Sequence, residues 1–176
     1  MVALLLLAQG LNPGVMPKEP SVVPMLLQPG SQQTVLALPG GRFGFERPND
    51  AREVGRDEAR GLLVLAIPVG RQFCEFRLTT MAMPSGNVGS FALSQATRLR
   101  AIPGAHMESA RRVAPGLLRQ AVRFNLMGNP SMPRFITQWL RLDAGFGLLI
   151  ELEGPGAFEP ACIGRAQTAA MSVRRL

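Results

Sequence analysis

The chain has 176 residues, 47% of them hydrophobic, and 19 Lys and Arg against 12 Asp and Glu give a formal net charge of +7. This length and apolar content predict a single folded domain with a normal core. Nearly all the cations are arginines, since Lys18 is the only lysine. Guanidinium groups suit bidentate pairing with carboxylates at a docking surface, although a GC-rich genome produces the same bias.

Residue types argue against nucleic-acid and metal binding. The arginines are scattered, and nine Phe, one Trp and no Tyr leave few aromatic side chains for stacking on bases. With one His and no C-x-x-C motif, a structural zinc is excluded, and no sequence motif indicates a cofactor. Four phenylalanines are expected instead in the core, on alternating strands: Phe43, Phe45, Phe73 and Phe76.

The two cysteines, Cys74 and Cys162, lie far apart in the sequence. Free cysteines are among the most buried residues, so we expect two buried thiols. An oxidising compartment would allow the two to form a disulfide.

Residues 1–31 are predicted to form an extended, apolar, Pro-rich arm in front of a domain at 32–176. Five prolines between Asn12 and Ser31 fix φ and remove backbone donors, which favours a polyproline-like path. The apolar residues between these prolines are costly to leave in water, so we expect them to bind a partner: Val15, Met16, Val22, Val23, Met25, Leu26 and Leu27.

The apolar run within residues 1–10 lacks a basic flank and is shorter than the ~20 residues that span a bilayer. A remnant of a targeting sequence, an interfacial anchor and a partner-packing segment all remain open. No other stretch has the length of a membrane helix, so we expect a soluble or peripheral protein without a transmembrane span.

The first half of the domain is predicted to be mostly strands. Two short strands are expected at 34–38 and 42–47 around a Gly turn, followed by a charged loop or helical turn at 50–60. The continuous apolar run at 62–69 indicates a central strand buried on both faces. Residues 72–83 alternate, which predicts a half-buried strand.

The second half combines two helices with antiparallel strands. Ser90 is the expected N-cap of a helix that ends before Pro103, and a strand follows at 106–113. A hairpin is expected from 135–142 and 146–152, then a last helix at 158–170. This order predicts an α+β fold with a mainly antiparallel sheet flanked by helices.

The strand at 118–126 is predicted to have one core face and one basic face. Leu118, Gln120, Val122 and Phe124 alternate with Arg119 and Arg123. We expect Arg119 and Arg123 to face acidic groups of a partner.

Candidates for catalysis are few. His106 could act as an acid or base, but a neighbouring nucleophile such as Ser109 needs the base within hydrogen-bond reach. The carboxylates between Asp50 and Glu58 stand among Arg52, Arg56 and Arg60, which is typical of a solvated, ion-paired surface. We therefore expect that the protein is not an enzyme and keep a hydrolase centred on His106 as a reserve hypothesis.

The domain resembles the PsbP-like superfamily, which includes the Ran-binding Mog protein and bacterial lipoproteins. The similarity covers about residues 34–176 and rests on the order of several short motifs. These are G-x-F-x-F-x-x-P at 41–48, the helix at Ser90 with I-P-G at 102–104, the Gly-led strand at 116–124, and the hairpin leading to Phe158. The sequence departs from the family at 49–50 and 171–175.

This resemblance implies an α-β-α sandwich and a role as an adaptor. Its best-known branch consists of extrinsic lumenal proteins that dock on photosystem II through an extended N-terminal segment. We therefore expect an accessory subunit on a larger, membrane-associated protein complex, in the thylakoid lumen or another extracytoplasmic compartment. The alternative is a free-standing secreted lipoprotein-like domain or a chaperone for apolar client segments.

Overall fold

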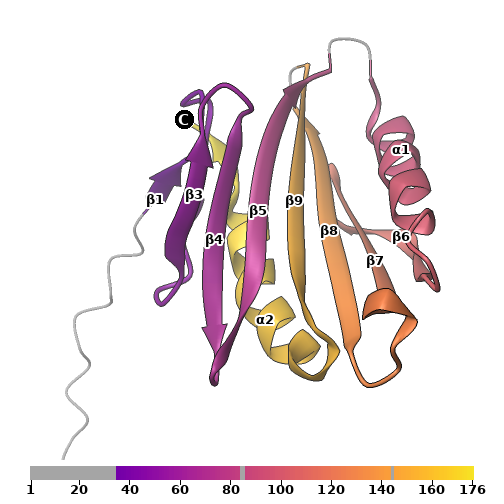
Figure 1. Ribbon diagram of the computed structural model, residues 1–176. Helices are drawn as coiled ribbons and strands as arrows, with labels where there is room; N and C mark the ends of the chain where they lie inside the picture. The colour runs from indigo at the N-terminus through magenta and orange to yellow at the C-terminus, as the bar shows by residue number, and fades with distance from the viewer. Residues whose placement is uncertain (1–34, 84–85, 144) are drawn as a thin grey trace, which may run out of the picture. The chain divides into compact units, whose positions relative to one another are not determined.

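Antiparallel strands and two helices make up the computed structural model, which describes residues 35–83, 86–143 and 145–176 (Figure 1). Within this part of the chain, seven strands form a sheet in the order β3-β4-β5-β9-β8-β7-β6, and three more form a small sheet, β1-β2-β10. The predicted α+β class, with a mainly antiparallel sheet flanked by helices, is confirmed. The strands are β1 Val35–Ala37, β2 Phe43–Glu46, β3 Arg52–Asp57, β4 Leu62–Val69, β5 Gln72–Ala82, β6 His106–Ala114, β7 Leu117–Asn125, β8 Pro133–Asp143, β9 Phe146–Pro155 and β10 Arg174–Arg175.

Tight hairpins connect most neighbouring strands of the large sheet. The turn between β4 and β5 has two residues, and Gly70 supplies the positive φ of 60° that its first position requires. The predicted hairpin of β8 and β9 is present, with Leu148, Ile150 and Leu152 almost fully buried along β9.

Three expectations for the first half of the sheet are wrong. Residues 52–57 form strand β3 instead of a loop, because pairing with β4 leaves their charged side chains in water at the sheet edge. Strand β4 is therefore second from the edge, and only alternate residues such as Leu65 are fully buried. Phe73 is 60% exposed, whereas Phe43, Phe45 and Phe76 are in the core as predicted.

Helix α1, Val88–Arg100, covers one face of the sheet over β6, β7 and β8. Its N-cap is Asn87, not Ser90. The Asn87 side chain accepts from the Ser90 backbone amide at 2.8 Å, and the Ser90 hydroxyl lies 3.3 Å from the Asn87 amide in return. The buried face of the helix, which includes Phe91 and Leu99, contacts β8 residues such as Leu140 and Ile136.

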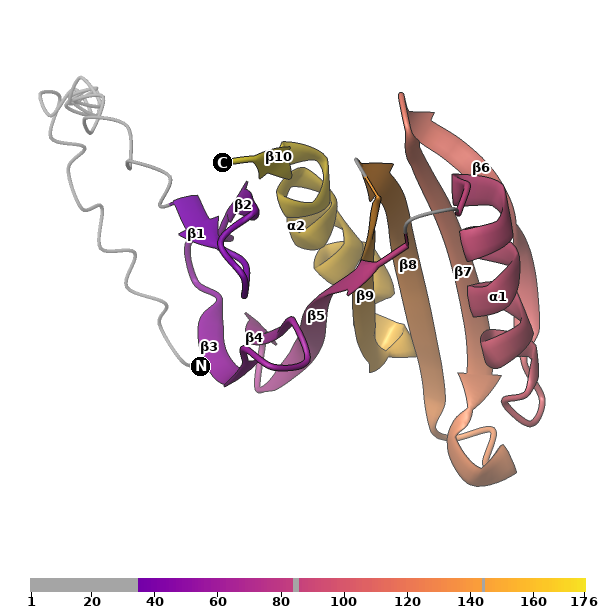
Figure 2. The same ribbon diagram turned by 90° about the horizontal axis from the view of Figure 1, so that it is seen from above.

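Helix α2, Glu159–Ser172, covers the opposite face, mainly over β9, β4 and β8 (Figures 1 and 2). Its buried residues Cys162, Ala166 and Ala169 join the main core with Phe76 and Trp139. After the helix, β10 pairs with β2, so the short chain end closes the small sheet.

A disulfide joins Cys74 of β5 to Cys162 of α2, with both residues fully buried and 88 residues apart in the sequence. The expectation of free thiols is therefore wrong. The reason is geometric, because α2 crosses β5 with the two Cα atoms 6.3 Å apart, within disulfide reach. Burial of cysteine, which favoured the free thiol, is equally compatible with a bridge.

Candidate partner-binding surface

The arm residues predicted to bind a partner lie outside the described residues. These are Val15, Met16, Val22, Val23, Met25, Leu26 and Leu27. Their role stays a prediction from the sequence. The two other predicted contacts, Arg119 and Arg123, lie on β7 and can be placed.

Strand β7 alternates as predicted, but both of its faces carry buried residues. Leu118 and Val122 contact the clusters under α1, whereas Leu117 joins the core on the α2 face. Arg119, Ala121 and Arg123 share the side of Leu117 by the two-residue repeat of a strand. The predicted basic face is thus the α2 face of the sheet, at the end where β6 and β7 lie.

Arg123 is neutralised within the chain. Its guanidinium donates to the Glu159 carboxylate at 2.7 and 2.9 Å and to Glu108 at 2.6 Å. The hydrogen bonds to Glu159, and next those to Glu108, raise the pKa of Arg123 above its ordinary value. The acidic groups that Arg123 faces therefore include two of its own chain.

Arg119 is placed differently from an exposed docking residue, since it is only 8% exposed. Its Nε atom has no hydrogen-bond partner among the described residues. Burial, and next the positive charge of Arg111, lower the pKa of Arg119 from its ordinary value. The sequence pattern predicted a basic face turned away from the core. The structure instead buries Arg119 on a face that also carries core residues, because the pattern does not show what covers that face.

A chain of buried polar groups crosses the other face of the sheet, under α1. Glu151 of β9 accepts from Gln138 at 2.7 Å and from Arg77 at 3.1 Å, and it also pairs with Arg98 of α1. Gln138 in turn accepts from Gln120 of β7 at 2.7 Å. Sequence analysis missed this network, because its members share a face only once the order β5-β9-β8-β7 is known.

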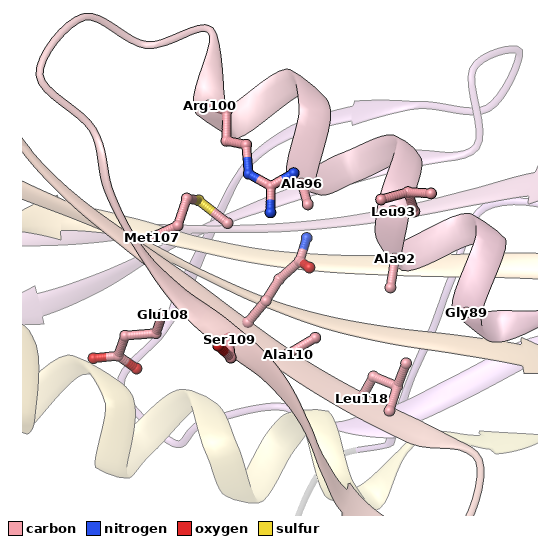
Figure 3. A pocket seen from close by; sticks show the side chains of 11 residues that line it. Gly89, Ala92, Leu93, Ala96, Arg100, Met107, Glu108, Ser109, Ala110 and Leu118 are labelled. Atoms are coloured by element: carbon pink, nitrogen blue, oxygen red, sulfur yellow. The ribbon is translucent and has the colours of Figure 1, made fainter.

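The chain of amides ends at a pocket of about 320 Å³ between α1 and β6 (Figure 3). Small or apolar side chains from the helix and from β6 form most of its wall, and Arg100 is the charged side chain that lies toward it. The Glu108 carboxylate points to the other face of β6, where Arg123 binds it. Such a lining suits an apolar group of modest size more than a charged one. The apolar lining residues are Ala92, Leu93, Ala96, Met107, Ala110 and Leu118.

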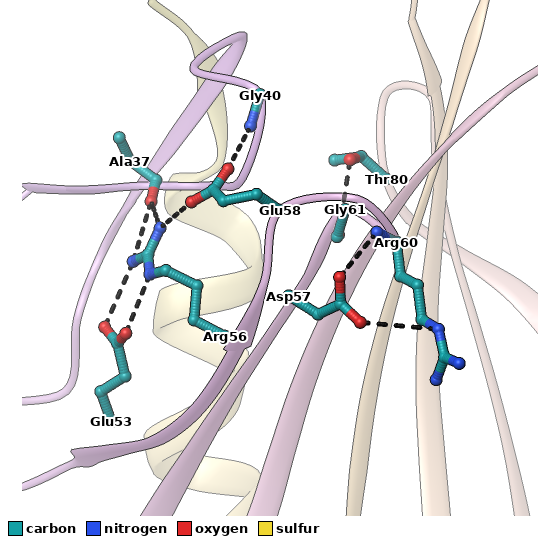
Figure 4. Close-up of polar contacts among 9 residues, drawn as sticks. All are labelled: Ala37, Gly40, Glu53, Arg56, Asp57, Glu58, Arg60, Gly61 and Thr80. Carbon is teal, nitrogen blue, oxygen red and sulfur yellow. Dashed lines mark hydrogen bonds and ion pairs between the residues drawn. The ribbon is translucent and has the colours of Figure 1, made fainter.

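A second polar cluster joins β3 to the first described strands (Figure 4). Arg56 pairs with both oxygens of Glu53 at 2.8 and 3.2 Å, and it donates to the Ala37 carbonyl at 3.5 Å. Glu58 accepts from Arg56 at 3.3 Å and from the Gly40 amide at 3.1 Å. The predicted ion-paired surface is thus present, and it ties β3 to the segment that follows β1.

The catalytic candidates remain separate side chains. His106 and Ser109 are both exposed on β6, and no hydrogen bond links them. Among residues 35–83, 86–143 and 145–176, no group of three or more His, Cys, Asp or Glu side chains is arranged to hold a metal ion. In the same part of the chain, neither helix has the length and hydropathy needed to cross a membrane.

Comparison with known proteins identifies the fold. No family model and no curated protein matches the sequence. Among solved structures, LpqN of Mycobacterium tuberculosis, described as involved in cell envelope biogenesis, matches with a TM-score of 0.60 at 10% identity, over 83% of this chain and 86% of LpqN. Cyanobacterial PsbP (CyanoP) of Synechocystis matches with a TM-score of 0.52 at 13% identity, over 81% and 92%.

A Bacteroides thetaiotaomicron protein matches with a TM-score of 0.56 at 16% identity, over 83% of this chain and 49% of the other. At these identities the likeness shows the fold alone. The PsbP-like resemblance of the sequence is confirmed at that level.

Proposed function

We propose that this protein is a non-catalytic accessory subunit of an extracytoplasmic compartment, which docks on a larger, membrane-associated complex through its N-terminal arm. By the PsbP-like resemblance, the complex is a photosystem and the compartment the thylakoid lumen. The domain serves as the scaffold that presents the arm.

The observation that supports an extracytoplasmic location is the buried Cys74–Cys162 disulfide. Disulfides persist in oxidising compartments and are rare in the cytosol, where thiols are kept reduced. The shared fold with LpqN and CyanoP agrees with this placement, since LpqN is described as an envelope biogenesis protein.

The docking role is supported by composition. Seven apolar residues lie between the prolines of residues 12–31, in a segment without an alternating or helical pattern. Prolines lower the conformational entropy that the arm loses on binding, and the apolar side chains supply buried area. In the domain, by contrast, most acidic side chains that could act in catalysis are bound in ion pairs such as those of Glu151 and Glu159.

Co-fractionation tests this proposal. We expect the native protein to migrate in a particle much larger than 19.0 kDa. Replacing Val22, Val23 and Leu26 by Ser should release it, because the apolar contact area is lost. Replacing Ser21 and Gln28 by Ala in the same arm is the matched control and should leave it bound. Migration of the native protein alone would contradict the docking role.

The pocket under α1 favours the second candidate, a chaperone for apolar client segments. Its apolar wall of about 320 Å³ can hold one or two client side chains. Filling it with Ala110→Phe, on the exposed strand β6, should then abolish protection of an aggregating client, whereas the arm substitutions should not. If the accessory-subunit proposal holds, the arm substitutions release the protein from its complex in the co-fractionation assay, and Ala110→Phe does not.

A further inference from the structure

Three arginines and two carboxylates gather on the α2 face of β6 and β7, beyond the strands that α2 mainly covers. We call this set the arginine cluster: Arg111, Arg119, Arg123, Glu108 and Glu159. Arg123 uses both carboxylates in its hydrogen bonds. The three guanidinium groups and two carboxylates together carry one net positive charge. Arg123 is already paired, so this excess lies at Arg111 and Arg119.

A β-bulge creates this excess. Glu108 pairs with Ala121 and Arg111 pairs with Arg119, so three steps along β6 match two steps along β7. Without the extra residue, Ala110 would stand opposite Arg119 and Arg111 would point to the other face. Bulges of this kind re-aim side chains next to functional sites. Like charges directly opposite on a sheet destabilise it, so this arrangement opposes folding.

Arg119 adds to that cost. The residue is 8% exposed, and its Nε has no acceptor among the described residues. Burying a charge without a partner is expensive, and an apolar residue of similar volume is often tolerated better. Hydrogen bonds within the described part of the chain therefore do not explain an arginine here.

We propose that the arginine cluster binds one carboxylate, the acidic side chain of a protein on which this chain docks. The inference rests on the proposed docking function and adds to it the chemistry of the partner. A guanidinium pairs with a carboxylate through two parallel hydrogen bonds, and the geometry is specific. A single carboxylate also balances the single excess charge, whereas a phosphate dianion would leave the cluster negative. Arg119 is nearly closed off, so only the end of one side chain reaches it.

Trp139 offers a built-in reporter. It is the only tryptophan of the chain, it stands directly opposite Arg119 in the β7–β8 register, and it is fully buried. Its indole N–H has no hydrogen-bond partner among the described residues. A carboxylate that orders the Arg119 guanidinium should therefore shift the indole resonance in a ¹⁵N–¹H spectrum.

The test titrates the full chain with acetyl-Ala-Ala-Glu-Ala-Ala-amide, with the same peptide carrying Gln in place of Glu, and with inorganic phosphate at equal ionic strength. We expect a saturable shift of the Trp139 resonance with the Glu peptide only. Arg111→Gln should weaken this binding about tenfold, as the loss of one charge-assisted contact predicts. Arg112→Gln is the matched control, since Arg112 stands opposite Leu118 and belongs to the other face.

Arg119→Met is a second test. The variant lacks the guanidinium, so we expect it to abolish peptide binding. Met keeps a long apolar side chain without the buried charge, so we expect the melting temperature to rise. A lower melting temperature would show that the guanidinium serves folding and would overturn the inference.

Equal shifts with the Glu and Gln peptides, or equal affinities for the Arg111 and Arg112 variants, would likewise overturn it. Tighter binding of phosphate than of the Glu peptide would make this a small-anion site instead and refute the docking version. Because the titration uses the isolated protein, these failures leave the co-fractionation result of the arm variants unaffected.

Discussion

Removal of the Cys74–Cys162 disulfide by substitution of both cysteines with Ala should destabilise the domain strongly. The bridge links residues 88 apart, so in the unfolded chain it closes a loop of that length. Chain-entropy arguments give about 4.6 kcal/mol at 25 °C for such a loop, and a native disulfide typically contributes 2–5 kcal/mol. In a domain of this size, 1 kcal/mol shifts the melting temperature by about 2–4 °C. We therefore expect a fall of about 10–15 °C.

Thermal and urea unfolding of the oxidised protein, with and without reductant, measure this difference. Both cysteines are fully buried, so reduction should require unfolding and should be slow in the absence of urea. The double Ala variant is the internal control, because reductant should not change its stability. A loss below about 1 kcal/mol, or rapid reduction of the native protein, would refute the argument and, with it, the support for an oxidising compartment.

Three further predictions concern the sheet and its edges. Glu151→Ala should cost about 2 kcal/mol in urea unfolding, since it leaves three donors without their buried acceptor. Gly154→Ala should cost about 1–3 kcal/mol because its Cβ would overlap a disulfide sulfur, whereas Gly164→Ala in α2 has open space and should add about 1 kcal/mol. The Arg56 hydrogen bond lowers the pKa of Glu53 below its ordinary 4.5 in the folded state. The ionised Glu53–Arg56 pair therefore contributes stability above pH 4.5, and this contribution is lost as the pH falls through the lowered pKa of Glu53. Arg56→Gln should raise the pKa of Glu53 measured by NMR titration.

Patterns in the sequence predicted the fold wherever one strand face meets the core. The alternation of Cys74, Phe76 and Leu78 placed β5 correctly, and that of Leu148, Ile150 and Leu152 did the same for β9. At the sheet edge the same reasoning failed. In β3 both faces are solvated or half-exposed, so no hydrophobic period marks the strand. The segment is a strand because its backbone pairs with β4.

The candidate site depends on contacts between distant segments, and these were only partly predictable. The alternation of β7 indicated that Arg119 and Arg123 share a face. It could not show that Glu159, 36 residues further on, would neutralise Arg123. The bulge in β6 was equally hidden, because it appears only in the register between Arg111 and Arg119. Such features follow from strand order and helix placement, which local patterns do not contain.

The arginine cluster and the disulfide are related through their opposite effects on stability. The two helices cover different parts of the sheet, one on each face, and α2 contacts β9, β4 and β8 more than β6 and β7 (Figure 2). Arg119 is buried, its Nε has no hydrogen-bond partner in the described part of the chain, and it stands opposite Arg111, which lowers the stability of that end. The disulfide, formed by Cys162 three residues after Glu159 in α2, stabilises the fold by an amount large enough to offset this cost. On this reasoning, reduced protein should be the background in which Arg119→Met gives its largest gain in the folded fraction.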